Sequence, residues 1–306
     1  METKSIDEKI EHIKSKVGDA IAINALSGGV DSSVVTFLGK MAIGNNLKTY
    51  FINTGFMRER EPETVWKTFK DLGIEINIIN EEKRFLEALK GITDGEEKRK
   101  VFSDTFYKIF GRIIKKEGAI YLFQGTIEPD KIMFDKGQSQ HNVRTKSDYS
   151  KFGIEGVIEP LFDLYKNQVR EIAIDLNLSD KIYNRQPFPG PGLLIRVLGE
   201  ATKERIEIVR KAQKIVEEEL LPYNPSQCLA CLANDTATGM IGGKASGKYM
   251  IFVRAVKTKD FMAAESLFLG KKTIAKIAKR IPEEIPNVAR VLYEITGKPP
   301  ATIEYI

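Results

Sequence analysis

Short apolar runs and stretches of helical periodicity alternate along the first half of the chain. The apolar runs predict buried strands at 20–26, 48–53, 74–80 and 119–124. Apolar residues three and four positions apart predict helices at 5–16, 31–43, 61–72 and 96–116. This alternation is typical of an α/β fold with a parallel sheet covered by helices on both faces, in which ligands bind beyond the carboxyl ends of the strands.

The pattern changes after a proline-rich stretch, RQPFPGPGLL at 185–194, whose prolines interrupt any helix or central strand. Beyond it, apolar runs predict strands at 193–199, 227–233, 249–257 and 288–296. Helical periodicity predicts helices at 202–220 and 271–280. This β-α-β-β-α-β order is an α+β plan, so we expect the 306-residue chain to form two domains, residues 1–186 and residues 187–306.

A polar segment without periodicity occupies residues 127–153. Long irregular segments inside compact domains are usually either disordered or functional lids. We therefore treat this segment as a candidate lid over the ends of the predicted strands.

The apolar run at 20–26 leads directly into SGGVDSS, residues 27–33. Gly28 and Gly29 can adopt positive φ and let the backbone approach a ligand closely. The aspartate and serines after them open the next helix, where free N–H groups favour an anion. A capped strand-to-helix turn would use the same residue types, so both interpretations stay open. The spacings of the Walker A and G-x-G-x-x-G motifs are absent.

Charge and composition narrow the class of ligand. The net charge is +5, and basic residues are spread along the chain, which favours a small anionic ligand over nucleic acid. No apolar run reaches the ~18 residues that a membrane helix needs, and the charged N-terminal sequence is unlike a signal peptide. We therefore expect a cytoplasmic protein that binds neither nucleic acid nor membranes.

The two cysteines, Cys228 and Cys231, form a C-x-x-C pair that invites a redox or metal interpretation. A zinc site would need two further nitrogen or sulfur ligands, and the histidines are His12 and His141. Because the neighbours of the cysteines alternate as in a strand, we expect both to be small residues within a sheet.

SGGVDSS resembles the pyrophosphate-binding loop (PP-loop) of the N-type ATP pyrophosphatases. Other stretches resemble, in the same order, the ATP-pyrophosphatase part of GMP synthetases: EEKRKVF (96–102), QGTIEPD (124–130), QPFPGPGLLIRVLGE (186–200) and GKPPATIEY (297–305). The resemblance implies an adenine-nucleotide α-hydrolase-like PP-loop domain followed by a smaller α+β domain that forms a homodimer and contributes to the XMP site. The chain length fits the two-subunit form, in which a separate glutamine amidotransferase supplies ammonia.

The implied reaction is ATP-dependent adenylation of XMP and its amination to GMP, with release of AMP and pyrophosphate. Asp31, Ser32 and Asp130 would be catalytic, and Asp31 and Asp130 could hold Mg²⁺, although Asp130 also suits a simple turn after Pro129. The implied ATP and pyrophosphate site comprises Ser27, Gly28, Gly29, Val30, Asp31, Ser32, Ser33, Gln124, Gly125 and Thr126.

The implied XMP site comprises Arg99, Gln227, Lys298, Ile303 and Glu304. Without the resemblance, Arg99 would be interpreted as part of a solvated helix face. Lys298 precedes two prolines that constrain its backbone, and its ammonium group suits a nucleotide phosphate.

The chain departs from the family pattern at Asn53, Met133, Gln138, Gln140 and Gly243, where the family usually carries charged residues or histidine. Each change removes a charged or titratable group from the implied active site. Two alternatives therefore stay open beside GMP synthesis: a divergent paralogue that adenylates another oxo-base or nucleotide, and a non-catalytic nucleotide-binding regulatory subunit.

Overall fold

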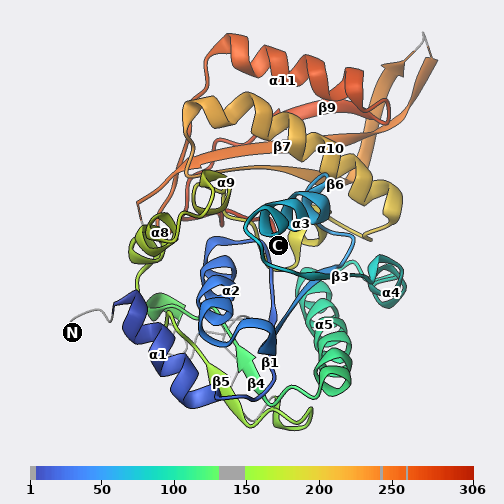
Figure 1. Cartoon of the computed structure of the whole chain (residues 1–306). Coiled ribbons are helices and arrows are strands. Elements are labelled where there is room, and N and C mark those ends of the chain that lie inside the picture. Colours follow the sequence, from blue (N-terminus) through green and yellow to red (C-terminus); the bar gives the residue numbers. More distant parts are fainter. Residues whose placement is uncertain (1–4, 131–148, 242–243, 260) are drawn as a thin grey trace. The chain divides into compact units, whose positions relative to one another are not determined.

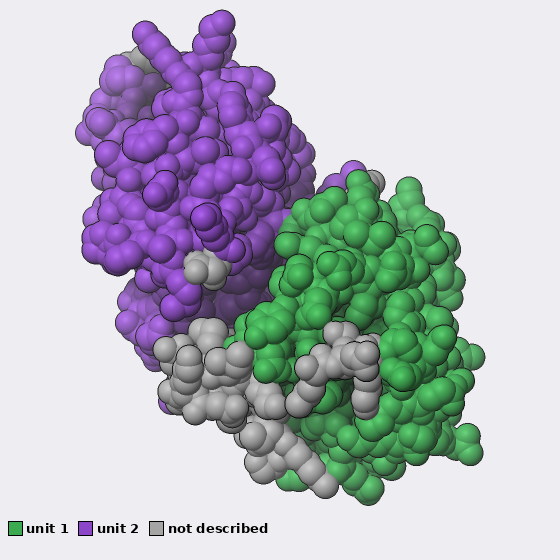
Figure 2. Space-filling view, turned by 90° about the vertical axis from the view of Figure 1, so that its left-hand side faces the viewer, with its two compact units in different colours: residues 1–53, 62–80, 106–185 green, residues 54–61, 81–105, 186–306 purple. Residues whose placement is uncertain are grey.

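The computed structural model describes residues 5–130, 149–241, 244–259 and 261–306. The chain divides into two compact units, which Figure 2 distinguishes by colour. Unit 1 comprises residues 1–53, 62–80 and 106–185, and unit 2 comprises residues 54–61, 81–105 and 186–306. Two stretches from the first half of the chain therefore group with the C-terminal residues.

Unit 1 is built on a parallel sheet in the order β3-β2-β1-β4-β5 (Figure 1). Its strands are β1 (Ala22–Ala25), β2 (Leu47–Asn53), β3 (Asn77–Asn80), β4 (Tyr121–Phe123) and β5 (Gly156–Ile158). The central strand β1 places Ala22 opposite Leu47 of β2 on one side and Tyr121 of β4 on the other. The predicted parallel α/β sheet is confirmed, and β5 is a short strand that the apolar pattern did not reveal.

Helices flank this sheet, and two of them, α3 and α5, begin in stretches of unit 2. They are α1 (Ile6–Val17), α2 (Val30–Ile43), α3 (Glu61–Asp71), α5 (Gly95–Glu117), α8 (Lys166–Asp175) and α9 (Asp180–Tyr183), with the 3₁₀ turn η1 (Gly44–Asn46). The helices α1, α2 and α8 share one apolar core through Ile13, Val34 and Val169. This packing holds the first turn of α2 firmly at the carboxyl end of β1.

Unit 2 contains a four-stranded sheet in which β7 lies between β6 and β9. Its strands are β6 (Gln227–Ile241), β7 (Lys244–Lys257), β8 (Glu265–Ser266) and β9 (Val288–Tyr293). Its helical segments are α4 (Glu82–Ala88), η2 (Gly192–Arg196), α10 (Lys203–Leu220), η3 (Leu221–Tyr223) and α11 (Lys271–Glu284). The β6–β7 pair is antiparallel and β9 runs parallel to β7, so the predicted α+β plan of this part is confirmed in class.

One predicted strand of unit 2 is wrong. The apolar pattern predicts a strand at 193–199, but most of this segment forms the 3₁₀ turn η2, and only Val197 makes an isolated bridge to Leu232. The cause lies upstream, because Gly192 adopts φ +62° and the prolines before it prevent an extended entry into a sheet. The side chains of Leu193, Leu194, Ile195 and Val197 are nevertheless buried.

The predicted boundary after residue 186 lies one residue beyond the end of unit 1 at Arg185. An aromatic cluster joins residues 54–61 to residues 81–105: the ring centroids of Phe85 and Phe102 are 5.0 Å apart, and that of Phe56 lies 6.2 Å from each. The two stretches are bonded to the C-terminal part of unit 2 where the carbonyl of Phe56 accepts from the N–H of Leu193 at 2.7 Å and Lys98 donates to the carbonyl of Val197 at 2.7 Å. That residues 1–186 form the ATP-pyrophosphatase domain and residues 187–306 the dimerisation and XMP-binding domain stays a prediction.

Candidate active site

The loop SGGVDSS lies where the parallel sheet predicts a ligand site, between the carboxyl end of β1 and the first turn of α2. Gly28 has φ +77°, a conformation that favours glycine. The N-cap position of α2 is Gly29, so no side chain caps this helix. The N–H groups of its first turn are therefore available to an anion, which favours the phosphate interpretation over a capped turn.

The hydroxyl groups of the loop are bonded to the loop itself. Ser32 Oγ lies 2.9 Å from Ser27 Oγ and donates to the carbonyl of Gly29 at 3.1 Å. Ser33 Oγ donates to the same carbonyl at 2.8 Å. These bonds hold the loop in shape, and rotation of the Ser27 and Ser32 hydroxyls would let them donate to a phosphate instead.

The QGT sequence at the end of β4 lies against this loop. A methyl group added at Gly125 would come within 3.2 Å of Asp31 Cβ and 3.3 Å of Ser32 N, so only glycine fits without displacing the loop. Both polar atoms of the Gln124 amide are buried and have no hydrogen-bond partner among the described residues. Thr126 is held by its hydroxyl, which donates to Glu159 at 2.5 Å.

Two carboxylates meet at the same edge. Asp31 Oδ2 pairs with Lys166 from α8, and Asp31 Oδ1 is buried without a partner among the described residues. Asp130 Oδ2 accepts from the N–H of Ile127 at 3.2 Å. Burial raises the pKa of Asp130, and the nearby Asp31 raises it further, while the Ile127 bond and Lys166 oppose this. A cation at this edge would stabilise the charged form of Asp130 against burial and would reduce its repulsion by Asp31.

Lys166 and Arg185 are site residues that sequence reasoning missed. Lys166 pairs with Asp31, and Arg185 Nη1 donates to the carbonyl of Gly28 at 2.7 Å. Both lie more than 100 positions from the loop in sequence, with separations of 135 and 157 residues, so no local pattern marks them.

In unit 2, Glu304 lies at the centre of a buried polar cluster. Arg196 forms a two-bond ion pair with it, Nε to Oε2 at 3.0 Å and Nη2 to Oε1 at 2.7 Å. Gln227 Nε2 donates to Oε1 at 2.6 Å. Two of the residues implied for XMP, Gln227 and Glu304, are therefore in direct contact. A lone arginine inside the apolar run LLIRVL was the available signal for a buried charged partner.

The other three implied XMP residues have separate partners. Arg99 pairs with Glu96 and donates to the backbone oxygen of Ile306. Lys298 Nζ donates to the carbonyl of Phe261 at 2.7 Å. Ile303 is buried in an apolar cluster with Leu229. Arg99 is thus tied to the same C-terminal segment that carries Glu304, whereas Lys298 is not joined to this network by the described contacts.

The cysteine pair lies in β6 as expected, with both side chains buried and the thiols free. Burial raises the pKa of the Cys228 thiol to about 12 and raises that of Cys231 as well, which leaves both unreactive. No cluster of metal-ligating side chains occurs among the described residues.

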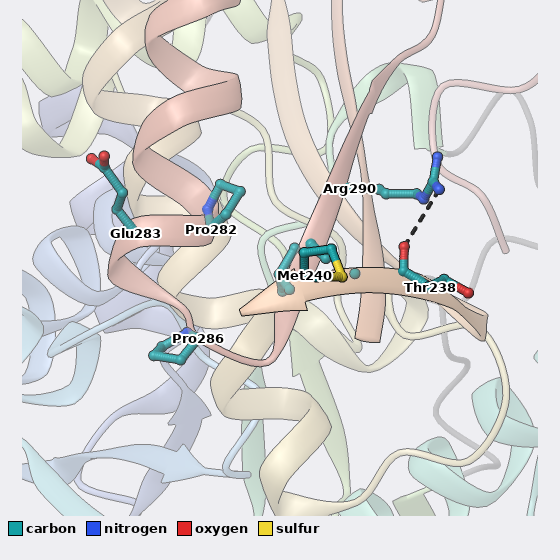
Figure 3. Close-up of a pocket in the computed structure, with 9 residues that line it drawn as sticks. Thr238, Met240, Pro282, Glu283, Pro286 and Arg290 are labelled. Atoms are coloured by element: carbon teal, nitrogen blue, oxygen red, sulfur yellow. Dashed lines mark hydrogen bonds between the residues drawn. The ribbon is translucent and has the colours of Figure 1, made fainter. Parts of the chain in front are cut away.

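A pocket of unit 2 lies between β6, the end of α11 and the start of β9 (Figure 3). Arg290 reaches across it and donates to the carbonyl of Thr238 at 3.4 Å. None of the residues implied for ATP or XMP lines this pocket.

Four of the positions that depart from the family pattern, Met133, Gln138, Gln140 and Gly243, lie outside the described residues, as does most of the candidate lid. Asn53 is the last residue of β2 and pairs in register with Asn80 of β3. No helix in the described parts of the chain is long and apolar enough to cross a membrane.

Known proteins match this chain over nearly its whole length. The NAD synthase family model matches residues 2–106, and the model of the GMP synthase C terminal domain matches residues 214–305. A subunit of the glutamine-hydrolyzing GMP synthase of Pyrococcus furiosus is 49% identical over 306 residues, 99% of this chain and 97% of that protein. The chain belongs to this family of GMP synthase subunits.

Other members of the GMP synthase family are similarly close. The corresponding protein of Archaeoglobus fulgidus is 48% identical over 99% of this chain and 98% of that protein, and the one of Methanocella arvoryzae is 46% identical over 98% and 97%. The family predicted from SGGVDSS and the later motifs is therefore confirmed.

Proposed function

We propose that this chain is the ATP-pyrophosphatase subunit of a GMP synthase, a ligase that forms a carbon–nitrogen bond. It transfers AMP from ATP to the C2 oxygen of XMP, and ammonia then displaces AMP to give GMP. The observation that carries the proposal is the PP-loop of unit 1: its Asp31 and the neighbouring Gln124 hold buried polar atoms without a partner among the described residues. Membership of the GMP synthase family supports it.

The residues of unit 1 would bind and orient ATP. The N–H groups at the start of α2 and the hydroxyls of Ser27 and Ser32 would hold the β- and γ-phosphates, which leave as pyrophosphate. The buried hydroxyl of Ser33 would support the loop through its bond to the Gly29 carbonyl. The uncapped N-terminus of α2 favours the charge that develops on this leaving group. The Gln124 amide would bond the nucleotide, since it offers both a donor and an acceptor.

The carboxylates at this edge fit Mg²⁺. Asp31 Oδ1 is a buried oxygen without a partner among the described residues, and burial penalises the charged form of Asp130. Carboxylate oxygens are the ligands that Mg²⁺ prefers. When bound, the ion would neutralise charge on the ATP phosphates. Lys166 already pairs with Asp31 and supplies part of this positive charge.

On the XMP side, Arg99, Gln227, Lys298, Ile303 and Glu304 would bind the nucleotide. Lys298 and Arg99 carry cations suited to its phosphate. Glu304 can only accept hydrogen bonds, so it would contact an N–H or hydroxyl group of XMP.

Ammonia would come from a separate glutamine amidotransferase, because the two cysteines of this chain are buried in β6 and cannot serve as nucleophiles of a glutaminase. We further propose a homodimer formed through unit 2. The exposed apolar side chains of Phe268 and Ile295, which follow the neighbouring ends of β8 and β9, support this, since a contiguous exposed apolar patch marks an interaction site. The predicted cytoplasmic location rests on the sequence alone.

The deciding experiment incubates the protein with ATP, Mg²⁺, XMP and ammonium chloride and identifies the products. We expect pyrophosphate release that depends on XMP, and equal amounts of AMP and GMP. Ser32→Ala and Asp31→Ala should each reduce the rate of pyrophosphate release by about a hundredfold. The matched substitution Ser15→Ala, at an exposed position of α1, should leave this rate unchanged.

Other outcomes would point to the two alternatives. Another oxo-base nucleotide that outcompetes XMP would identify a divergent paralogue. Binding of ATP or XMP in equilibrium dialysis without any turnover would identify a regulatory subunit. Either result would overturn the proposal.

A further inference from the structure

Arg196 is a fully buried guanidinium that carries its bonds to a single carboxylate and a single amide. Its side chain is 0% exposed, against 17% for that of Glu304. Nε and Nη2 bind Glu304, and Nη1 donates to Gln213 Oε1 at 2.9 Å. Each nitrogen of the guanidinium uses one of its N–H groups in these bonds, and because the side chain is not exposed, Arg196 itself does not reach a ligand.

Glu304, by contrast, keeps part of its bonding capacity. A carboxylate has about four acceptor positions. Oε1 accepts from both Arg196 and Gln227, and Oε2 accepts only from Arg196. One position on Oε2 is therefore unused by the described residues. The partly exposed carboxylate can offer it to a ligand in a direction that Arg196 fixes, because a two-bond pair allows only one relative orientation.

The surroundings of Arg196 hold it in place. Gln213 is buried in α10 and binds Arg196 through Oε1, the same atom that accepts from the N–H of Ala230 in β6 at 2.9 Å. The Phe188 ring lies 5.0 Å from the guanidinium carbon. Gly192 begins the turn η2 that carries Arg196, and a methyl group there would come within 2.2 Å of the Phe56 carbonyl. The stretch PFPGPGLLIR thus helps to fix the position of the Arg196 guanidinium.

We propose that Arg196 is a positioning residue for the nucleotide site of unit 2: it orients the Glu304 carboxylate toward the substrate without touching the substrate itself. The inference rests on the proposed function, in which Glu304 contacts XMP. Gln213 in turn holds Arg196 in place, because its Oε1 accepts from Arg196 Nη1.

The test compares Arg196→Lys with wild type in the XMP-dependent release of pyrophosphate. Lysine keeps the charge but cannot form the two-bond pair. We expect KM for XMP to rise by about tenfold or more, while KM for ATP stays within about twofold. The matched control is Arg205→Lys, a buried arginine of the same unit that binds only backbone carbonyls, at Leu198, Glu200 and Ala233. It should lower the melting temperature without changing KM for XMP.

A double-mutant cycle separates positioning from general support of the fold. If Arg196 acts through Glu304, Arg196→Lys should change KM for XMP by less than about twofold when Glu304 is already Gln. Multiplying effects in the double variant, or an unchanged KM for XMP in Arg196→Lys, would overturn the proposal. If Arg196→Lys does not fold, Gln213→Leu should raise KM for XMP in the same way and lose that effect in the Glu304→Gln background.

The wild-type assay distinguishes a failure of the proposed function from a failure of the role of Arg196. Absence of any XMP dependence in wild type would contradict the proposed function. XMP dependence in wild type together with an unaltered Arg196→Lys enzyme would contradict only the role of Arg196.

Discussion

The two carboxylate oxygens of Asp31 lie in different environments. One of its oxygens is paired with Lys166, and the other is buried without a partner among the described residues. A buried carboxylate oxygen left unpaired costs free energy, and the protein bears this cost at a position where the carboxylate would meet a cation and a nucleotide. Gly125 makes this possible, because the absence of a side chain lets the end of β4 lie directly against Asp31 and Ser32.

Gly125→Ala should therefore impair ATP binding specifically. The added methyl group would lie 3.2 Å from Asp31 Cβ and 3.3 Å from Ser32 N, which displaces the loop by a few tenths of an ångström. We expect KM for ATP to rise about tenfold, because small misplacements of a phosphate loop are costly. Steady-state kinetics with varied ATP and then varied XMP would check this. An equal rise in both KM values would indicate a general loss of structure instead.

The loop itself could be predicted because all of its determinants are local: glycines, hydroxyls and an aspartate within seven consecutive residues, 27–33. Lys166 and Arg185 could not, since they reach the loop only through the folding of α8 and the chain beyond it. Arg99 and Glu304 were found by resemblance alone. The charged stretch EEKRK around Arg99 favours solvent exposure, and nothing in the apolar surroundings of Glu304 marks it as a binding residue.

At the scale of elements, η2 shows where apolar patterning is insufficient. The run LLIRVLG has the composition of a strand, and its residues 193–197 are buried as in a central strand. Its backbone was not, because apolar periodicity cannot distinguish a strand from a short buried turn. The deciding information lies in Gly192, whose φ of +62° begins a 3₁₀ turn.

Gly192→Ala should be strongly destabilising. The new methyl group would meet the Phe56 carbonyl at 2.2 Å, and φ +62° is a conformation that alanine rarely adopts. We expect the free energy of unfolding to fall by at least about 2 kcal/mol. Gly190→Ala, two residues earlier with open space around it, should change stability by less than about 0.5 kcal/mol. Urea unfolding of both variants measures the difference, and equal effects would contradict this account of the turn.

Helix α5 carries a lysine that is buried beside Arg99. Lys98 is 0% exposed and donates to the carbonyl of Val197 at 2.7 Å. Burial and, to a smaller extent, the nearby Arg205 lower the pKa of Lys98 from 10.5 to about 8, against smaller opposite effects of Cys231 and Asp94. The charged form therefore costs stability in the folded protein.

This burial predicts a rise in stability at alkaline pH. Below pH 8 both states hold the proton on Lys98 and the cost of burying the charge is present in full. Between about 8 and 10.5 Lys98 binds its proton in the unfolded chain but not in the folded protein, so the contribution of Lys98 to stability rises with pH by up to about 3 kcal/mol. The buried thiols of Cys228 and Cys231, whose pKa values are raised, act in the opposite direction above about pH 9, so the Lys98 contribution is measured as the difference between wild type and Lys98→Met. Lys98→Met should lack this rise, whereas Lys100→Met on the exposed side of α5 should keep it. Parallel curves for wild type and Lys98→Met between about pH 7 and pH 10 would contradict it.

For the whole molecule, the exposed apolar residues of unit 2 are the feature to explain. The ends of β8 and β9 are neighbours, because Ser266 Oγ donates to the carbonyl of Glu294 at 3.0 Å. Phe268 and Ile295 extend from these ends and are 85% and 68% exposed. Covering them in a second copy would remove this apolar surface from water.

Phe268→Lys combined with Ile295→Lys should therefore shift the protein from dimer to monomer. Two charges in an apolar interface would meet their equivalents in the partner and oppose association. Sedimentation velocity over a range of concentrations checks the result. Ile174→Lys, an exposed apolar position of α8 in unit 1, is the control and should leave the oligomeric state unchanged. A wild-type protein that is already monomeric would contradict the homodimer.

The interleaving of the two units has a consequence for the order of events on the ribosome. Residues 54–61 and 81–105 leave the exit tunnel long before residues 186–306, with which they form unit 2. At synthesis rates of about 5–20 residues per second, Phe56 and Lys98 are made seconds before Leu193 and Val197, to which they are hydrogen-bonded in the folded protein. A nascent chain stalled shortly after unit 1 has emerged would thus hold two stretches of unit 2 without their C-terminal partners, and chaperones bind such incompletely folded segments.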